Sequence, residues 1–128
     1  MRTMNDIFEI PEVDLKEYPI TYFAYIGDAV LSLYSRLKYM NLKKPSEVEK
    51  HIKGLVSRSG QSKNLDRIFS TLTEDEKAIV KRAMNSKAAT RHGNDRDYRN
   101  STGLEALIGY LFLKKDFNRL KSILSEVE

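Results

Sequence analysis

The stretch PITYFAYIGDAVLSLYSRLKYM, residues 19–40, decides the fold class. Apolar side chains recur in it at steps of three and four residues, which is the spacing of one face of a helix. Pro19 suits the first turn, where its missing N–H is not needed. The sequence therefore predicts a long helix from about Pro19 to Met40. The stripe that we predict to be buried consists of Phe23, Ile26, Val30, Leu33 and Leu37.

The rest of the chain shows the same helical periodicity, and no run of residues alternates in the manner of a strand. A capping box beginning at Ser46, after Pro45, predicts the second helix, and another at Thr73 predicts a helix to about Asn85. Further helices are predicted over about 62–72, 102–113 and 116–127. Residues 85–100 lack apolar periodicity and are predicted to form a long loop. The predicted fold class is all-α, with about six helices in a single domain over residues 1–128.

Composition narrows the possible functions. The chain of 128 residues has no cysteine and two histidines, which excludes disulfides, thiol nucleophiles and Cys-ligated metal sites and argues against a His-rich zinc site. Residues 1–20 are acidic and do not resemble a secretory signal. The longest uncharged run, 18–27, is far shorter than the roughly 20 apolar residues that span a bilayer. We therefore predict a cytoplasmic protein without a membrane span.

The net charge of +4 is distributed unevenly along the chain. Residues 43–67 carry seven basic residues against three acids, and residues 81–99 carry six against two. Two separate basic blocks on one small domain indicate a surface for a polyanion. The alternative is that both blocks are ordinary solvated surface.

The first candidate for chemistry is Asp28, which is the only acid between Tyr18 and Glu47. It lies away from the predicted apolar stripe of its helix. The adjacent Gly27 costs about 1 kcal/mol relative to alanine inside a helix, so it predicts a close approach by another backbone or by a partner. The alternative is an ordinary exposed aspartate on a polar face.

The second candidate is Glu105, within STGLEALIGY, residues 101–110. It lies at the rim of a predicted apolar stripe, with Gly109 one turn further on. Thr102 and Glu105 also have the spacing of a capping box, which is the structural alternative. Two carboxylates from two helices can hold a hard divalent cation through oxygen ligands, with water in the remaining positions. The spacing leaves open whether Asp28 and Glu105 converge.

These two motifs resemble those of a known enzyme family. Residues 25–31, YIGDAVL, resemble the signature helix of the ribonuclease III family, and residues 104–109, LEALIG, resemble its second acidic motif. The closer resemblance is to the short Mini-ribonuclease III group, and we expect the chain to lack a double-stranded-RNA-binding domain, as that group does. Standard members carry four acids at the site. Two of those positions fall on Ala24 and Thr102 here, which also fits the short group.

The resemblance implies hydrolysis of double-stranded RNA with Mg²⁺, or with Mn²⁺ as a substitute, giving 5′-phosphate and 3′-hydroxyl ends. It implies that Asp28 and Glu105 are the catalytic residues and the metal ligands. It also implies a homodimer with Tyr25 at its interface, and the 23S ribosomal RNA precursor as substrate. Tyr98 and His92 are candidates for contacts near an RNA end. The predicted RNA contacts are Lys53, Arg58, Ser59, Gln61, Lys63, Asn85, Lys87, Arg91 and Arg99.

Two other function classes remain open from the sequence. A non-catalytic, dimeric helical RNA-binding module is supported by the two missing acids and the missing RNA-binding domain. A helix-turn-helix DNA-binding protein fits less well, because acids lie within both motifs and the positive charge is not concentrated on one recognition helix.

Overall fold

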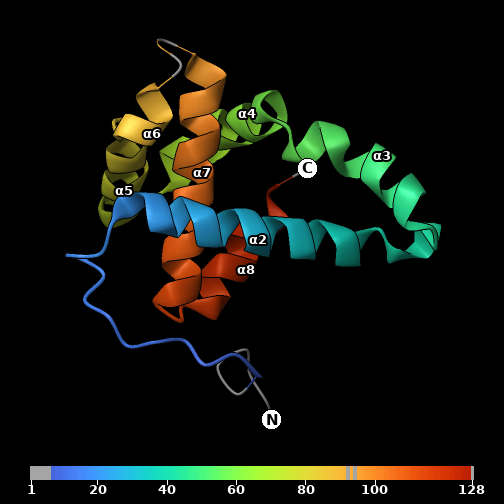
Figure 1. Ribbon diagram of the computed structural model, residues 1–128, viewed down its shortest axis with the longest axis horizontal. Coiled ribbons are helices and arrows are strands. Elements are labelled where there is room, and N and C mark those ends of the chain that lie inside the picture. Colours follow the sequence, from blue (N-terminus) through green and yellow to red (C-terminus); the bar gives the residue numbers. More distant parts are fainter. Residues whose placement is uncertain (1–6, 92, 94, 128) are drawn as a thin grey trace.

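The computed structural model describes residues 7–91, 93 and 95–127, and the regular structure in this part of the chain is entirely helical. Two short 3₁₀ helices, Met40–Leu42 and Phe69–Thr71, follow α2 and α4. The predicted all-α class is confirmed. The α-helices are α2 (Ile20–Lys38), α3 (Pro45–Val56), α4 (Arg58–Ile68), α5 (Glu74–Met84), α6 (Lys87–Thr90), α7 (Arg96–Leu113) and α8 (Phe117–Ser125) (Figure 1).

Helix α7 is the centre of the fold. It packs against α2, α4 and α5 and also contacts α8 (Figure 1). Its predicted apolar stripe is confirmed, because Leu104, Leu107, Ile108 and Leu111 are all buried. Burial of each such side chain contributes roughly 1.5–3 kcal/mol relative to exposure. The second acidic motif therefore lies on the most completely enclosed helix of the domain.

The predicted stripe of α2 is only partly correct. The face that packs into the interior consists of Phe23, Gly27, Leu31 and Ser35. Leu33 and Leu37, which were predicted to be buried, are 47% and 58% exposed. Helix α2 has two nonpolar faces, and its inner face uses small residues where backbones approach closely. The periodicity of apolar residues therefore predicted the outer face of α2 to be the buried one.

Local capping explains where the next helices begin. The predicted capping box at Ser46 is wrong, because α3 begins at Pro45 and has no side-chain cap. Helix α4 begins four residues earlier than predicted, because the Ser57 hydroxyl accepts a hydrogen bond from the Gly60 N–H at 3.2 Å. The capping box at Thr73 is confirmed, with the Glu76 carboxylate accepting from the Thr73 N–H at 2.9 Å.

The predicted loop over residues 85–100 is largely helical. Ser86 caps the short helix α6, and the Asp95 carboxylate caps α7 by accepting from the Tyr98 N–H at 3.0 Å. Thr102 and Glu105 thus lie inside α7, so the capping-box alternative for this pair is wrong. The Thr102 hydroxyl instead donates to the Tyr98 carbonyl at 3.0 Å. The first turns of α7 bury polar rather than apolar side chains, which is why periodicity missed them.

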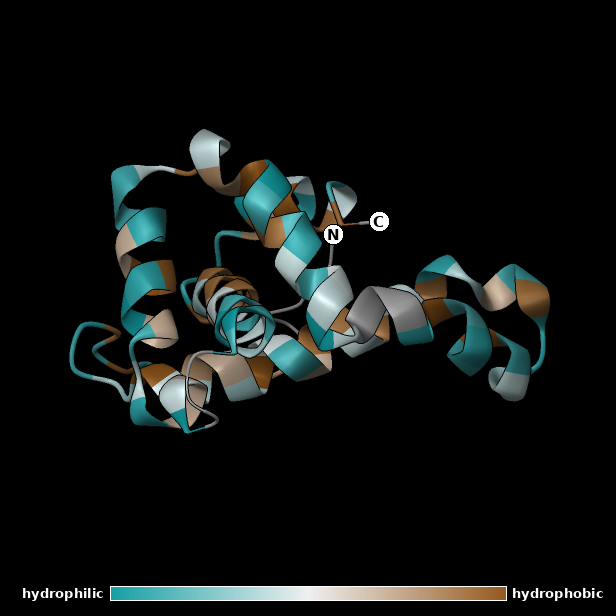
Figure 2. Cartoon of the chain, turned by 90° about the horizontal axis from the view of Figure 1, so that it is seen from above, coloured by the Kyte–Doolittle hydropathy of each residue, from teal (hydrophilic) through white to brown (hydrophobic). Residues whose placement is uncertain are grey.

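Helix α3 and the C-terminal part of α2 extend together beyond the bundle (Figures 1 and 2). Figure 2 shows hydrophilic and hydrophobic residues alternating along the helices, as expected of amphipathic helices around one core. Each helix in the described ranges is too short or too polar to serve as a membrane span.

Candidate active site

Helices α2 and α7 cross with their backbones in direct contact. A Cβ atom on Gly27 would overlap the Glu105 carbonyl and lie 2.9 Å from the Gly109 nitrogen. A Cβ atom on Gly109 would likewise overlap the Phe23 carbonyl. Both glycines are therefore required by the crossing itself. The close approach predicted from Gly27 is the approach of α7.

This crossing brings the two candidate carboxylates together. Asp28 directly follows Gly27, and Glu105 lies one turn before Gly109, so each acid flanks the contact point. Asp28 is the one ionisable group whose interaction raises the pKa of Glu105, so the two side chains lie close together. Asp28 is exposed and Glu105 is partly buried. The pair therefore opens to solvent on the α2 side and is closed on the α7 side.

The shared environment changes the protonation of the pair. Burial, together with the hydrogen bond and the negative charge of Asp28, raises the pKa of Glu105 to about 8. Near neutral pH the Glu105 carboxyl therefore keeps its proton. A cation between them would relieve the same repulsion, so the donor set fits a hard divalent metal ion. Within the described residues no third Asp, Glu or His joins the pair, so water would complete the coordination.

A family model described as "Ribonuclease III domain" matches residues 22–116. The chain belongs to the ribonuclease III family. A Mini-ribonuclease 3 from Kosmotoga olearia is 42% identical over 98% of this chain and 89% of its own length. One from Staphylococcus aureus is 37% identical over 85% of each chain. The crystal structure of a Fusobacterium nucleatum protein has a TM-score of 0.77 at 31% identity, covering 89% of this chain and 94% of that one.

These matches place the chain in the Mini-ribonuclease 3 group of the ribonuclease III family, as the two motifs predicted. It is an endoribonuclease, and its substrate class is double-stranded RNA. Members of the ribonuclease III family generally use a divalent metal ion. Membership of this family also favours an enzyme over the two alternatives, an RNA-binding module and a helix-turn-helix DNA-binding protein.

The predicted RNA contacts of this ribonuclease III domain differ in their exposure to solvent. Gln61 is buried between helices at 3% exposure, and Arg99 is half-buried. His92 lies outside the described residues. Tyr25 is 71% exposed, and its ring contacts Tyr22 at 5.6 Å between centroids. The exposed candidates are Lys53, Arg58, Ser59, Lys63, Asn85, Lys87 and Arg91.

Arg99 and Arg58 already have partners within the chain. The Arg99 side chain donates from Nε to the Met84 carbonyl at 3.0 Å and from Nη2 to Asn85 Oδ1 at 2.9 Å. It thereby joins the start of α7 to the end of α5. The Arg58 guanidinium lies 4.5 Å from the centroid of the Tyr98 ring. This cation–π contact leaves Arg58 on the surface beside α7.

A polar network that sequence reasoning missed joins α4 to α7, with Ser62 and Asn100 buried and Asp66 and Arg96 exposed. Asn100, 2% exposed, donates to the Ser62 hydroxyl at 3.0 Å and to Asp66 Oδ1 at 3.5 Å. Arg96 adds a 2.9 Å ion pair with Asp66. Hydrogen bonds between two helices fix their register. The sequence signal for this network is the spacing of polar residues within 58–66, which a search for apolar periodicity does not consider.

Proposed function

We propose that the chain cleaves double-stranded RNA with Mg²⁺, for which Mn²⁺ substitutes, and that Asp28 and Glu105 are the metal ligands and catalytic residues. One observation carries this proposal: the glycine crossing of α2 and α7 places these two carboxylates against each other. The hydrolysis leaves 5′-phosphate and 3′-hydroxyl ends.

The two carboxylates have different surroundings and therefore different tasks. Exposed Asp28 lies where a phosphate of the substrate can approach. Partly buried Glu105 is fixed by the central helix and holds the inner side of the site. When bound, a divalent cation supplies Lewis acidity toward the phosphate and lowers the pKa of a bound water. Thr102 uses its hydroxyl hydrogen within α7, so we assign it no more than a minor contact.

The RNA duplex is gripped by the exposed candidates from the two basic blocks. Duplex RNA is recognised mainly by its shape, through phosphates and 2′-hydroxyls across the wide minor groove. Lys53, Lys63, Lys87 and Arg91 are exposed and supply charge for the phosphates. Arg58 and Ser59, at the start of α4, add a guanidinium and a hydroxyl. Arg99 and Asn85 support this surface through their mutual hydrogen bond.

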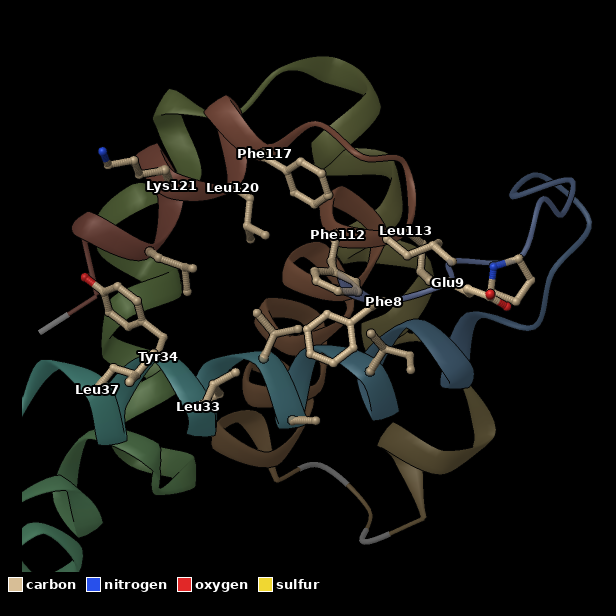
Figure 3. A pocket seen from close by; sticks show the side chains of 16 residues that line it. Phe8, Glu9, Leu33, Tyr34, Leu37, Phe112, Leu113, Phe117, Leu120 and Lys121 are labelled. Carbon is tan, nitrogen blue, oxygen red and sulfur yellow. The ribbon is translucent and has the colours of Figure 1, made fainter. Parts of the chain in front are cut away.

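We also propose that the chain works as a homodimer formed through the outer face of α2. Ile26, Leu33 and Leu37 line an apolar groove of about 640 Å³ between α2, the end of α7 and α8 (Figure 3). The charged residues among those lining it are Glu9 and Lys121. One acid and one base on the same apolar surface suit a two-fold interface, in which each can meet its opposite in the other copy.

Tyr25 connects this groove to the carboxylate pair. It precedes Asp28 by three residues and Ala29 by four, so it shares a helix face with both. Ala29 lines the groove. The exposed Tyr25 ring therefore lies between the catalytic pair and the proposed interface. A dimer would carry two sites, which matches the two strands of a duplex.

The finer proposal concerns the natural substrate. By its resemblance to Mini-ribonuclease III alone, we propose that the enzyme trims the ends of the 23S ribosomal RNA precursor in the cytoplasm. Primer extension on a precursor transcript incubated with the enzyme tests this. Cuts confined to the duplex formed by the two precursor ends would support it, and uniform cutting of any duplex would contradict it.

Cleavage assays test the site directly. Wild-type protein with Mg²⁺ should cut duplex RNA, and adaptor ligation should detect 5′-phosphates on the products. Asp28→Asn should keep RNA binding in a gel-shift assay and lose cleavage, as should Glu105→Gln. Glu74→Gln is the matched control, because Glu74 is an exposed acid at the start of α5. Retained cleavage by Asp28→Asn, or no cleavage of varied duplexes by the wild type with either metal, would refute the proposal.

A further inference from the structure

The exposed large hydrophobic side chains of the described residues are concentrated in one part of the chain. All of them fall within residues 7–40, on the segment before α2, on α2 itself and on the 3₁₀ turn after it. Contiguous exposed apolar surface usually marks an interaction site, whereas single exposed residues are common. They are Ile7, Phe8, Val13, Tyr22, Tyr25, Leu33, Leu37 and Met40.

Residues 7–11, which we call the N-terminal segment, lie along the groove on the outer side of α2. Phe8 and Ile10 line the groove together with Phe112 at the end of α7 and Phe117 at the start of α8 (Figure 3). Ile10 is 9% exposed, so it attaches the segment to the domain. The groove nevertheless retains a volume of about 640 Å³. The segment therefore forms part of the groove wall without filling the groove.

The exposure of Phe8 shows that its own chain covers only one side of the ring. Phe8 is 47% exposed, and the neighbouring Ile7 is 64% exposed. A segment that served only to seal the groove would bury its aromatic ring, because a phenylalanine side chain gains roughly 1.5–3 kcal/mol from full burial. Half of the ring is instead presented beside Leu33 and Leu37, which are exposed on the same groove.

We propose that the N-terminal segment is part of the contact between two copies of this chain, with Phe8 packed between its own α2 and the partner. The inference rests on the proposed homodimer and extends its interface beyond α2. Continuity supports a second copy as the occupant, because the segment and the outer face of α2 line one groove. Glu9 lies within the segment and Lys121 on α8 lines the other side, so a two-fold arrangement lets these charges meet across copies.

Sedimentation equilibrium on full-length variants tests the inference. Phe8→Ala should raise the dimer dissociation constant at least about tenfold, because aromatic anchors dominate interfaces and a two-fold dimer loses the ring twice. Val13→Ala is the matched control. It removes an exposed apolar side chain that precedes α2 but does not line the groove, and should leave the constant within about twofold. Leu33→Glu places a charge in the groove and should give a monomer.

The outcomes separate the inference from the homodimer it rests on. A monomeric wild type, or an unchanged dimer in Leu33→Glu, would refute the proposed dimer face and the inference with it. Loss of the dimer in Leu33→Glu with no effect of Phe8→Ala would refute the role of the N-terminal segment alone. Circular dichroism on each variant checks that helix content is retained.

A second measurement does not depend on removing Phe8. The chain has no cysteine, so Ile7→Cys provides a single attachment point for a nitroxide spin label. Spin-labelled chains without isotope are mixed with ¹⁵N-labelled chains without the spin label. Broadening of amide signals from the outer face of α2 then reports contact between copies. Absence of broadening in a mixture shown to be dimeric would refute the inference.

Discussion

Replacing Glu105 by glutamine should stabilise the metal-free protein, and increasingly so as the pH rises. The wild-type carboxyl is partly buried next to Asp28, so its charged form is disfavoured in the folded state. Glutamine keeps nearly the same shape and cannot ionise. The substitution should abolish cleavage while relieving a cost that the active site imposes on the fold.

The magnitude follows from the pKa. Folding raises the pKa of Glu105 from an ordinary 4.5 to about 8. An acid whose pKa is raised by folding has its full stability below pH 4.5 and loses it as the pH rises toward 8. At about 1.4 kcal/mol per pH unit, the raised pKa lowers the free energy of unfolding by about 1 kcal/mol at pH 5.5 and by about 4 kcal/mol at pH 8. The advantage of Glu105→Gln should therefore grow by roughly 3 kcal/mol between these two pH values, as an upper value for a residue at the rim.

Urea unfolding followed by circular dichroism measures this difference. Wild type and variant are compared at pH 5.5 and pH 8 with EDTA present and at equal protein concentration, because dimerisation would shift both curves. Groups elsewhere titrate equally in the two proteins and cancel in the comparison. Added Mg²⁺ should stabilise the wild type more than Glu105→Gln, because the cation takes the place of the proton on Glu105.

The control is Glu74→Gln, which removes one exposed carboxyl and should show no pH-dependent gain. Asp28→Asn should reduce the effect without abolishing it, because burial is the largest cause of the raised pKa of Glu105. Parallel stability curves for wild type and Glu105→Gln from pH 5.5 to 8 would refute the reasoning. They would mean that Glu105 is solvated and does not face Asp28.

Three further predictions concern the scaffold. Gly27→Ala should cost more than about 3 kcal/mol or prevent folding, because its Cβ would overlap the α7 backbone. Gly103→Ala should cost less in thermal unfolding, because its Cβ would meet the Met84 and Val80 side chains at 3.0 and 3.1 Å and the Val80 carbonyl oxygen only at 3.4 Å. Glu76→Gln should lower the free energy of unfolding by about 1–3 kcal/mol. The hydrogen bond to Arg119 lowers the pKa of Glu76, so this stabilisation exists above pH 4.5 and is lost as the pH falls through the lowered value, which urea titrations against pH will show. Gly93→Ala should cost about 1–2 kcal/mol through the backbone alone, because φ is 75° and no atom lies within 4 Å of the new Cβ.

The two acidic residues could be found from sequence because each lies in an apolar helix beside a glycine that helix formation alone would not favour. That Asp28 and Glu105 meet could not be found in this way. Their meeting depends on where two helices cross, and the crossing depends on Gly27 and Gly109 lying opposite each other in space. The residue pattern within one helix gives no information on where the other helix crosses it.

The misread regions share a physical cause. Periodicity measures which residues are apolar, whereas burial depends on what lies opposite them. Helix α7 starts earlier than predicted because Asn100 is buried through hydrogen bonds to α4 rather than through apolar contacts. Gln61 and Arg99 are polar or charged, so the sequence predicts them on the surface. In the fold, residues from other helices bury Gln61 and partly cover Arg99.

The wrong prediction for the buried face of α2 connects the carboxylate pair to the proposed dimer. Close approach of α7 requires small side chains on the inner face of α2, so the inner face carries Gly27 and Ser35. Small residues bury little apolar area, so the apolar burial of this face rests on Phe23 and Leu31, while Leu33 and Leu37 are exposed on the outer face. A helix that places its carboxylate against α7 thus gains less from its own core and exposes the surface a partner would cover. The same sequence constraint that brings Asp28 and Glu105 together thus leaves exposed the apolar surface through which we propose that a second copy binds.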